Sequence, residues 1–137
     1  MRYMFLIYSR ETERNNRPEE DLAKLRAVHH AVMEETAKRG IFRGAEPLKP
    51  TSTATTVRVD SSASDKPLIT DGPFAETKEQ LAGYYILECK DLDEAIQWAA
   101  KIPSGCKGEE GCIEIRPIEP IPQPGTAEFV SRSAGLR

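Results

Sequence analysis

Two adjacent histidines are the side chains of this chain best suited to move a proton. The sequence holds 2 histidines, His29 and His30, and a helix directs neighbouring side chains about 100° apart. The two rings therefore cannot share one role. His29 follows Leu25 by four residues and precedes Val32 by three, so it falls on the apolar stripe of a helix, with His30 near the stripe's border. We predict that His29 is the inward histidine.

Asp71 is the carboxylate that could work with His29. It precedes Gly72 and Pro73, where the chain must turn because glycine permits positive φ and proline fixes its own φ. If that turn reaches the helix, the carboxylate would orient one imidazole nitrogen, raise the pKa of His29 and leave the other nitrogen as acid or base. We predict a His29–Asp71 pair in a cleft between the first helix and the sheet. The alternatives are a core histidine bonded to a carbonyl and an aspartate that only caps its turn.

Three more side chains are candidates for binding a ligand in that cleft: Tyr8, Arg58 and Tyr84. An arginine on a strand can hold a carboxylate through two hydrogen bonds, although an exposed strand arginine is more often solvated. The chain contains no glycine-rich phosphate loop and no nucleophile elbow. Cys106 and Cys112 lie too far apart for the short zinc knuckle. We therefore predict no metal and no cofactor, which leaves cofactor-free chemistry or simple ligand binding.

Composition narrows the class of protein. The chain has 137 residues, enough for one domain, and a formal net charge of −3 with a pI near 5.5. Its basic residues are interspersed with acidic ones, so direct binding to nucleic acid is not expected. The apolar run 3–8 is too short for a membrane span or a signal peptide. We expect no membrane contact and a cytoplasmic protein whose three cysteines stay reduced.

The first half of the chain is predicted to hold a central strand and a long helix. The run 3–8 is almost continuously apolar, as in a strand at the centre of a sheet. An amphipathic helix should begin near Pro18 and end at Gly40. The segment 41–53 is expected to be an irregular crossing, with at most a short extended piece around 44–48. Residues 53–59 alternate and predict a half-exposed strand, followed by a hairpin loop at 60–66.

The second half repeats the strand and the helix. A short charged helical turn is expected at 75–80, a strand at 83–88 and a helix that Asp91 caps and that ends by Pro103. A peripheral strand at 112–116 should follow. Residues 119–137 are expected to form a proline-rich, extended or disordered tail, with a crossing onto a partner subunit as the alternative.

These elements predict an α+β fold of the ferredoxin-like, split βαβ type, with an antiparallel sheet and two helices on one face. The helix-free face would then expose tyrosine, isoleucine and valine side chains to water. A homodimer that packs sheet against sheet would cover them.

The run DGPFAETKEQLAGYY at 71–85 resembles the signature of DGPF-type proteins in the YCII-related superfamily. The segments TATTVRV at 53–59 and DLDEAIQWAAKIP at 91–103 occur in that family's order. The resemblance covers most of residues 1–118, which we take as the domain. His29 stands where related YCII proteins place a helix histidine, although DGPF-type relatives often have an aromatic residue there.

The resemblance implies a dimeric α+β barrel with a proposed His/Asp site and an activity that is largely unassigned. Two hypotheses of function follow. The first is a small-molecule-binding or enzyme-like protein, in which His29 acts on a carbonyl-bearing or unsaturated acid. The second is a regulatory module, because proteins of this type resemble accessory partners of alternative sigma factor systems.

Overall fold

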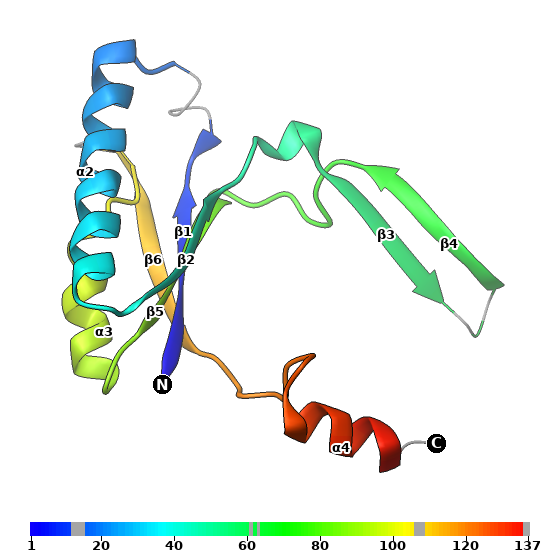
Figure 1. Cartoon of the computed structure of the whole chain (residues 1–137). Coiled ribbons are helices and arrows are strands. Elements are labelled where there is room, and N and C mark those ends of the chain that lie inside the picture. Colours follow the sequence, from blue (N-terminus) through cyan, green and yellow to red (C-terminus); the bar gives the residue numbers. More distant parts are fainter. Residues whose placement is uncertain (12–15, 61, 63, 106–108, 136–137) are drawn as a thin grey trace.

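A four-stranded antiparallel sheet forms the centre of the computed structural model, which describes residues 1–11, 16–60, 62, 64–105 and 109–135. The strand order is β2-β5-β1-β6, and two helices, α2 and α3, cover one face of the sheet (Figure 1). A helix follows the first and the third of these strands, as in the ferredoxin-like fold. The predicted fold class is therefore confirmed. The elements are β1 (Arg2–Ser9), α2 (Glu19–Lys38), β2 (Phe42–Pro47), β5 (Gln80–Glu88), α3 (Leu92–Ala99) and β6 (Gly111–Pro117).

The core lies between this sheet and the two helices. Buried and partly exposed residues alternate along β1 and along most of β5, because successive strand side chains point to opposite faces. Phe5 and Leu87 are fully buried on the helix-covered face, and Val32 of α2 and Trp98 of α3 pack over them in the same core. The alternate residues point away from the helices. One face of the sheet is thus closed and the other is open.

Local signals set the ends of the helices as predicted. Pro18 precedes the first turn of α2, and Gly40 follows the helix with φ at 72°, a conformation that a glycine adopts without strain. At α3, the carboxylate of Asp91 accepts a hydrogen bond of 2.9 Å from the backbone N–H of Glu94. These ends fix the registers in which α2 and α3 face the sheet.

The second strand of the sheet corrects the prediction. β2 covers residues 42–47, where an irregular segment with at most a short extended piece around 44–48 was expected, because Gly44 and Pro47 obscure the alternation that identifies a strand. An edge strand tolerates both residue types, since one row of its backbone groups needs no partner. The segment expected as the second strand instead forms β3 (Thr55–Asp60), which pairs with β4 (Ser64–Asp71) in a separate two-stranded sheet. This hairpin, residues 55–71, is called the arm below, and it projects away from the body (Figure 1).

The segment after the arm also differs from the prediction, since residues 75–80 form no helical turn. The hydroxyl of Thr77 donates to the carbonyl of Glu79 at 2.6 Å, and the side-chain amide of Gln80 donates to the Thr77 carbonyl at 2.5 Å. Such local side-chain bonds compete with helical backbone bonds. Phe74, at the start of this segment, is 77% exposed.

The C-terminal tail contains a helix, α4 (Ala127–Gly135), where an extended or disordered segment was predicted. The hydroxyl of Thr126 accepts a bond of 3.2 Å from the N–H of Phe129, which caps the first turn. An ion pair of 2.8 Å joins Arg132 to Glu128 one turn earlier. No α4 residue is buried, and the helix stands clear of the sheet (Figure 1).

The cysteines of the described ranges are free thiols: Cys89 is buried and Cys112 is exposed. Cys106, which was also predicted to be reduced, lies outside the described residues. None of the helices in these ranges combines the length and the apolarity that crossing a membrane requires.

Candidate functional site

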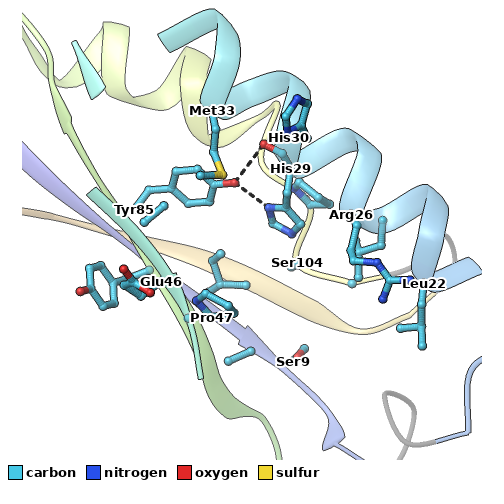
Figure 2. Close-up of a pocket in the computed structure, with 18 of the residues that line it drawn as sticks. Ser9, Leu22, Arg26, His29, His30, Met33, Glu46, Pro47, Tyr85 and Ser104 are labelled. Carbon is cyan, nitrogen blue, oxygen red and sulfur yellow. Dashed lines mark hydrogen bonds between the residues drawn. The ribbon is translucent and has the colours of Figure 1, made fainter. Parts of the chain in front are cut away.

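A cavity of about 520 Å³ lies between α2 and the sheet. Its walls come from the inward side of α2, from β1, β2 and β5, and from the loop that follows α3 (Figure 2). Most of the lining is apolar, which suits the carbon skeleton of a small ligand. The apolar side chains include Ile7, Leu22, Leu25, Met33, Ala45 and Ala82.

His29 and Tyr85 meet across this cavity (Figure 2). The Nδ1 atom of His29 lies 2.7 Å from the Tyr85 hydroxyl oxygen, and the two rings stack with centroids 5.8 Å apart. The same hydroxyl lies 3.4 Å from the His29 carbonyl, to which it can donate. Helix and sheet thus hold the imidazole through one nitrogen and leave Nε2 for other partners.

Burial sets the charge of both groups. It lowers the pKa of His29 below the ordinary value of 6.5, and it raises the pKa of Tyr85 to about 12. The cause is the same in each case, because a poorly hydrated site disfavours the charged form. At neutral pH the imidazole and the phenol are therefore both neutral. If Nδ1–H donates to Tyr85, Nε2 is an acceptor; if the phenol donates to Nδ1, Nε2 carries a proton to give.

Two arginines bring positive charge to the same cavity. Arg17 forms a two-pronged ion pair with Glu109, in which Nε donates to Oε1 at 2.6 Å. The side chains of this pair are only 5% and 15% exposed. Arg26, at the border of the cavity, pairs with Glu19 of α2, and both side chains are largely exposed. Among the described residues, no three His, Cys, Asp or Glu side chains gather where a metal ion could bind.

Two of the five predicted site residues, His29 and Tyr84, are among the residues that line this cavity. Only His29 turns its side chain toward it, since Tyr84 lies on the face of β5 opposite to Tyr85. The other three lie elsewhere. Asp71 is the last residue of β4, opposite Thr55 at the base of the arm. Arg58 is exposed on the arm, opposite Leu68. Tyr8 belongs to β1 but does not line the cavity, and it pairs with Leu81 and Cys112.

Tyr85 is the functional candidate that the sequence reasoning missed. Neighbouring strand residues point to opposite faces, so only one residue of the Tyr84-Tyr85 pair can face α2. Tyr85 shares its face with Leu87 and Cys89, whereas Tyr84 shares its face with the charged Glu88. The charge at Glu88 marks the open face, and this signal would have identified Tyr85 as the inward tyrosine.

Fold and cavity together define the class: a ferredoxin-like α+β protein with a ligand-sized cavity between a helix and the sheet. The model of the YCII-related domain matches residues 1–122. An uncharacterized protein of Rhizobium meliloti (strain 1021) is 33% identical over 118 residues, which cover 86% of this chain and 92% of that relative. The chain belongs to the YCII-related family, and the resemblance found in its signature is confirmed at that level.

Proposed function

We propose that this protein binds a small organic molecule in the cavity under α2 and that His29 acts there as acid or base. The observation that supports this most strongly is the 2.7 Å contact between His29 Nδ1 and the Tyr85 hydroxyl inside the cavity. A histidine held by one nitrogen and free at the other has the arrangement that proton transfer needs. Its lowered pKa keeps the imidazole neutral at pH 7, ready to accept a proton.

The lining suggests the class of ligand. An apolar skeleton fits the walls formed by α2 and the sheet. A ligand carboxylate on the side of Arg17 and Arg26 would compete there with Glu109 and Glu19 for these arginines. A carbonyl or double bond in the skeleton would then face His29. These features favour a carbonyl-bearing or unsaturated acid of modest size.

The pairing of His29 with Asp71 is a separate proposal, since within one chain Asp71 lies on the arm and does not line the cavity. A carboxylate beside the ring would raise the pKa of His29, against the effect of burial. NMR titration of Asp71→Asn tests this. A fall in the His29 pKa by about half to two units supports the pair, and an unchanged titration in a folded variant removes it.

A thermal-shift screen of organic acids tests the main proposal. A ligand that binds the folded state raises the melting temperature, and at equal concentration a tighter ligand raises it more. We expect the shift caused by a true ligand to be lost in His29→Gln and to persist largely in His30→Gln. His30 is the neighbouring control: it also borders the cavity, but its side chain is 80% exposed and contacts Glu34 on the surface of α2. Equal shifts in wild type and His29→Gln would contradict a role for His29.

The alternative from the sequence, a regulatory module for an alternative sigma factor system, can be tested on the same material. Pull-down with the wild-type protein should recover a sigma factor if that hypothesis is correct. Recovery that persists in His29→Gln, together with no response to the acid screen, would favour the regulatory module over the ligand site.

We also propose that the protein is a homodimer. The helix-free face of the sheet presents Met4, Leu6, Tyr84 and Ile86, which are all partly exposed. No helix of the described residues lies over this face (Figure 1). Packing two such faces together would remove apolar surface from water.

A further inference from the structure

The arm carries more exposed apolar surface than any other described hairpin or strand of the molecule. Val57, Val59, Leu68 and Ile69 are each between 58% and 65% exposed. Val57 and Ile69 are direct cross-strand partners, so their side chains share one face of the arm, whereas Arg58 and Leu68 share the opposite face. A soluble monomer seldom leaves such a cluster in water.

The arm is also poorly supported by its own chain. The N–H of Gly72 donates to the Ala54 carbonyl at 2.8 Å, and the Thr56 hydroxyl donates to the Gly72 carbonyl at 2.8 Å. Both bonds lie at the base, while the strands extend well beyond it (Figure 1). An isolated two-stranded hairpin is at best marginally stable in water. Its apolar face therefore needs a surface to pack against.

We propose that each arm packs against the sheet of a second copy of this chain, so that two copies exchange arms. This inference rests on the homodimer proposed above and specifies how it is held. The arm leaves the body on the side opposite the helices, which is the side that the open sheet face looks toward (Figure 1). A twofold axis between two copies would thus place each arm beside the other copy's open face, and both uncovered surfaces would be buried together.

The dimensions of the arm agree with this arrangement. β4 has 8 residues, which span about 26 Å at roughly 3.3 Å per residue. Packed sheets lie only about 10 Å apart. The arm is therefore long enough to reach the other copy's sheet and to run along it.

The charges on these surfaces favour a second copy over a different partner. β6 presents Glu114 beside Arg116 next to the open face, and the proposed docking face of the arm carries Asp71. A surface that meets itself across a twofold axis needs both signs of charge, whereas a strongly acidic or basic partner would select one sign. The mixed pattern is the one that self-association requires.

Asp71 acquires a role in this arrangement. It ends β4 in register with Thr55, two residues from the Val57–Ile69 pair, and therefore lies on the same face of the arm. Phe74, 77% exposed just beyond it, extends the apolar surface at the arm's base. The exchange would bring both residues into the contact between copies.

Analytical ultracentrifugation of the wild type and of two point variants tests the exchange. Ile69→Lys places a charge on the face proposed to be buried, twice per symmetric dimer, and should weaken dimerisation at least tenfold. Leu68→Lys is the matched control, since it makes the same kind of change on the opposite face. We expect it to weaken dimerisation less than threefold.

A shortened arm gives the second measurement. Residues 57–69 are replaced by a short glycine-containing turn between Thr56 and Thr70, which already pair. Fluorescence of Trp98 and circular dichroism establish that the variant is folded. We expect it to be monomeric at concentrations where the wild type is a dimer. If the shortened protein does not fold, the two point variants still decide.

Three results would overturn the exchange, and they can be told apart from failure of the ligand site. A shortened protein that dimerises like the wild type would mean that the sheet faces alone hold the dimer. Equal effects of Ile69→Lys and Leu68→Lys would show that the arm does not dock by the proposed face. A monomeric wild type would remove both the homodimer and the exchange, while the acid screen on His29 would stand unaffected.

Discussion

His29 is kept neutral by burial and receives its orientation from a phenol. A buried neutral partner differs from a carboxylate partner in the direction of its effect, because a carboxylate stabilises the imidazolium whereas burial destabilises it. In one chain the partner is the neutral Tyr85 at 2.7 Å, and burial lowers the pKa of His29. A neutral imidazole here can take a proton from a ligand at Nε2, and the burial that disfavours the imidazolium favours return of that proton to the ligand.

This assignment predicts how stability depends on pH. The folded pKa of His29 lies below its unfolded value of about 6.5, so the unfolded chain binds more protons as the pH falls through that value. Stability should therefore be retained above pH 6.5 and be lost as the pH falls below it. Urea unfolding at pH 7.5 and 5.5 should show a larger loss for wild type than for His29→Gln. An NMR midpoint for His29 above 6.5 would contradict the assignment.

Tyr85→Phe removes the hydroxyl that holds the imidazole. We expect a loss of about 0.5–1.5 kcal/mol of unfolding free energy, as for one hydrogen bond. Tyr3→Phe is the matched control, since Tyr3 is also buried but makes no hydrogen bond through its hydroxyl to the described residues. Because the pKa of Tyr85 is raised to about 12, wild type should also lose stability above pH 10 more steeply than the variant. A Tyr85→Phe protein as stable as Tyr3→Phe would argue against the contact.

The site could be predicted in part from residue types. His29 was found because helical periodicity places it on the apolar stripe, and the structure confirms that it faces the sheet. Tyr85 was missed because two adjacent tyrosines on a strand do not by themselves show which ring faces the helix. Arg17 could not be found from sequence, since its pairing with Glu109 joins residues that only the folded sheet brings together.

At the scale of elements, the Asp91 cap of α3 allows the contribution of one helix cap to stability to be measured. Asp91 accepts from Glu94 N–H at 2.9 Å, and the Glu94 carboxylate accepts from Lys90 N–H at 3.2 Å. We expect Asp91→Ala to cost about 1 kcal/mol of stability and Asp91→Asn to restore most of it, since asparagine caps equally well. Trp98 lies in α3 and reports unfolding by its fluorescence. Equal losses in both variants would mean that the charge, rather than the cap, matters.

The helices and central strands were predictable because their patterns are local, but the assignment of strands to sheets was not. β2 lacks alternation, and its place beside β5 depends on a close approach of backbones. A Cβ atom at Gly83 would lie only 2.7 Å from the Glu46 carbonyl oxygen, so glycine is required there. In the arm, by contrast, apolar and polar residues alternate as in a half-buried strand. This local pattern does not identify the surface against which the arm packs.

At the scale of the whole molecule, the chain divides into a closed half and an open half. Helices cover one face of the sheet and form the cavity around His29, while the arm and α4 extend from the other side (Figure 1). The ligand site and the proposed dimer contact therefore use different faces of one sheet. Strand β5 connects them, because Tyr85 faces the cavity and its neighbour Tyr84 belongs to the open face.

Removal of residues 119–137 tests whether the domain ends where the sheet does. The N–H of Ile118 donates to the Arg2 carbonyl at 2.9 Å and ties β6 to the edge of β1. Beyond it, α4 contains no buried residue, and the family match ends at residue 122. We expect the shortened protein to keep its unfolding free energy within about 0.5 kcal/mol, as for changes at exposed surface.

The same truncation tests whether the tail or the arm holds the dimer together. If exchanged arms and sheet faces hold two copies together, light scattering should still give a dimer, about twice the mass of one shortened chain. Urea unfolding followed by Trp98 should give the same midpoint as the full chain at equal concentration. A truncated protein that is folded but monomeric would show instead that α4, with its exposed Val130, carries the contact between copies.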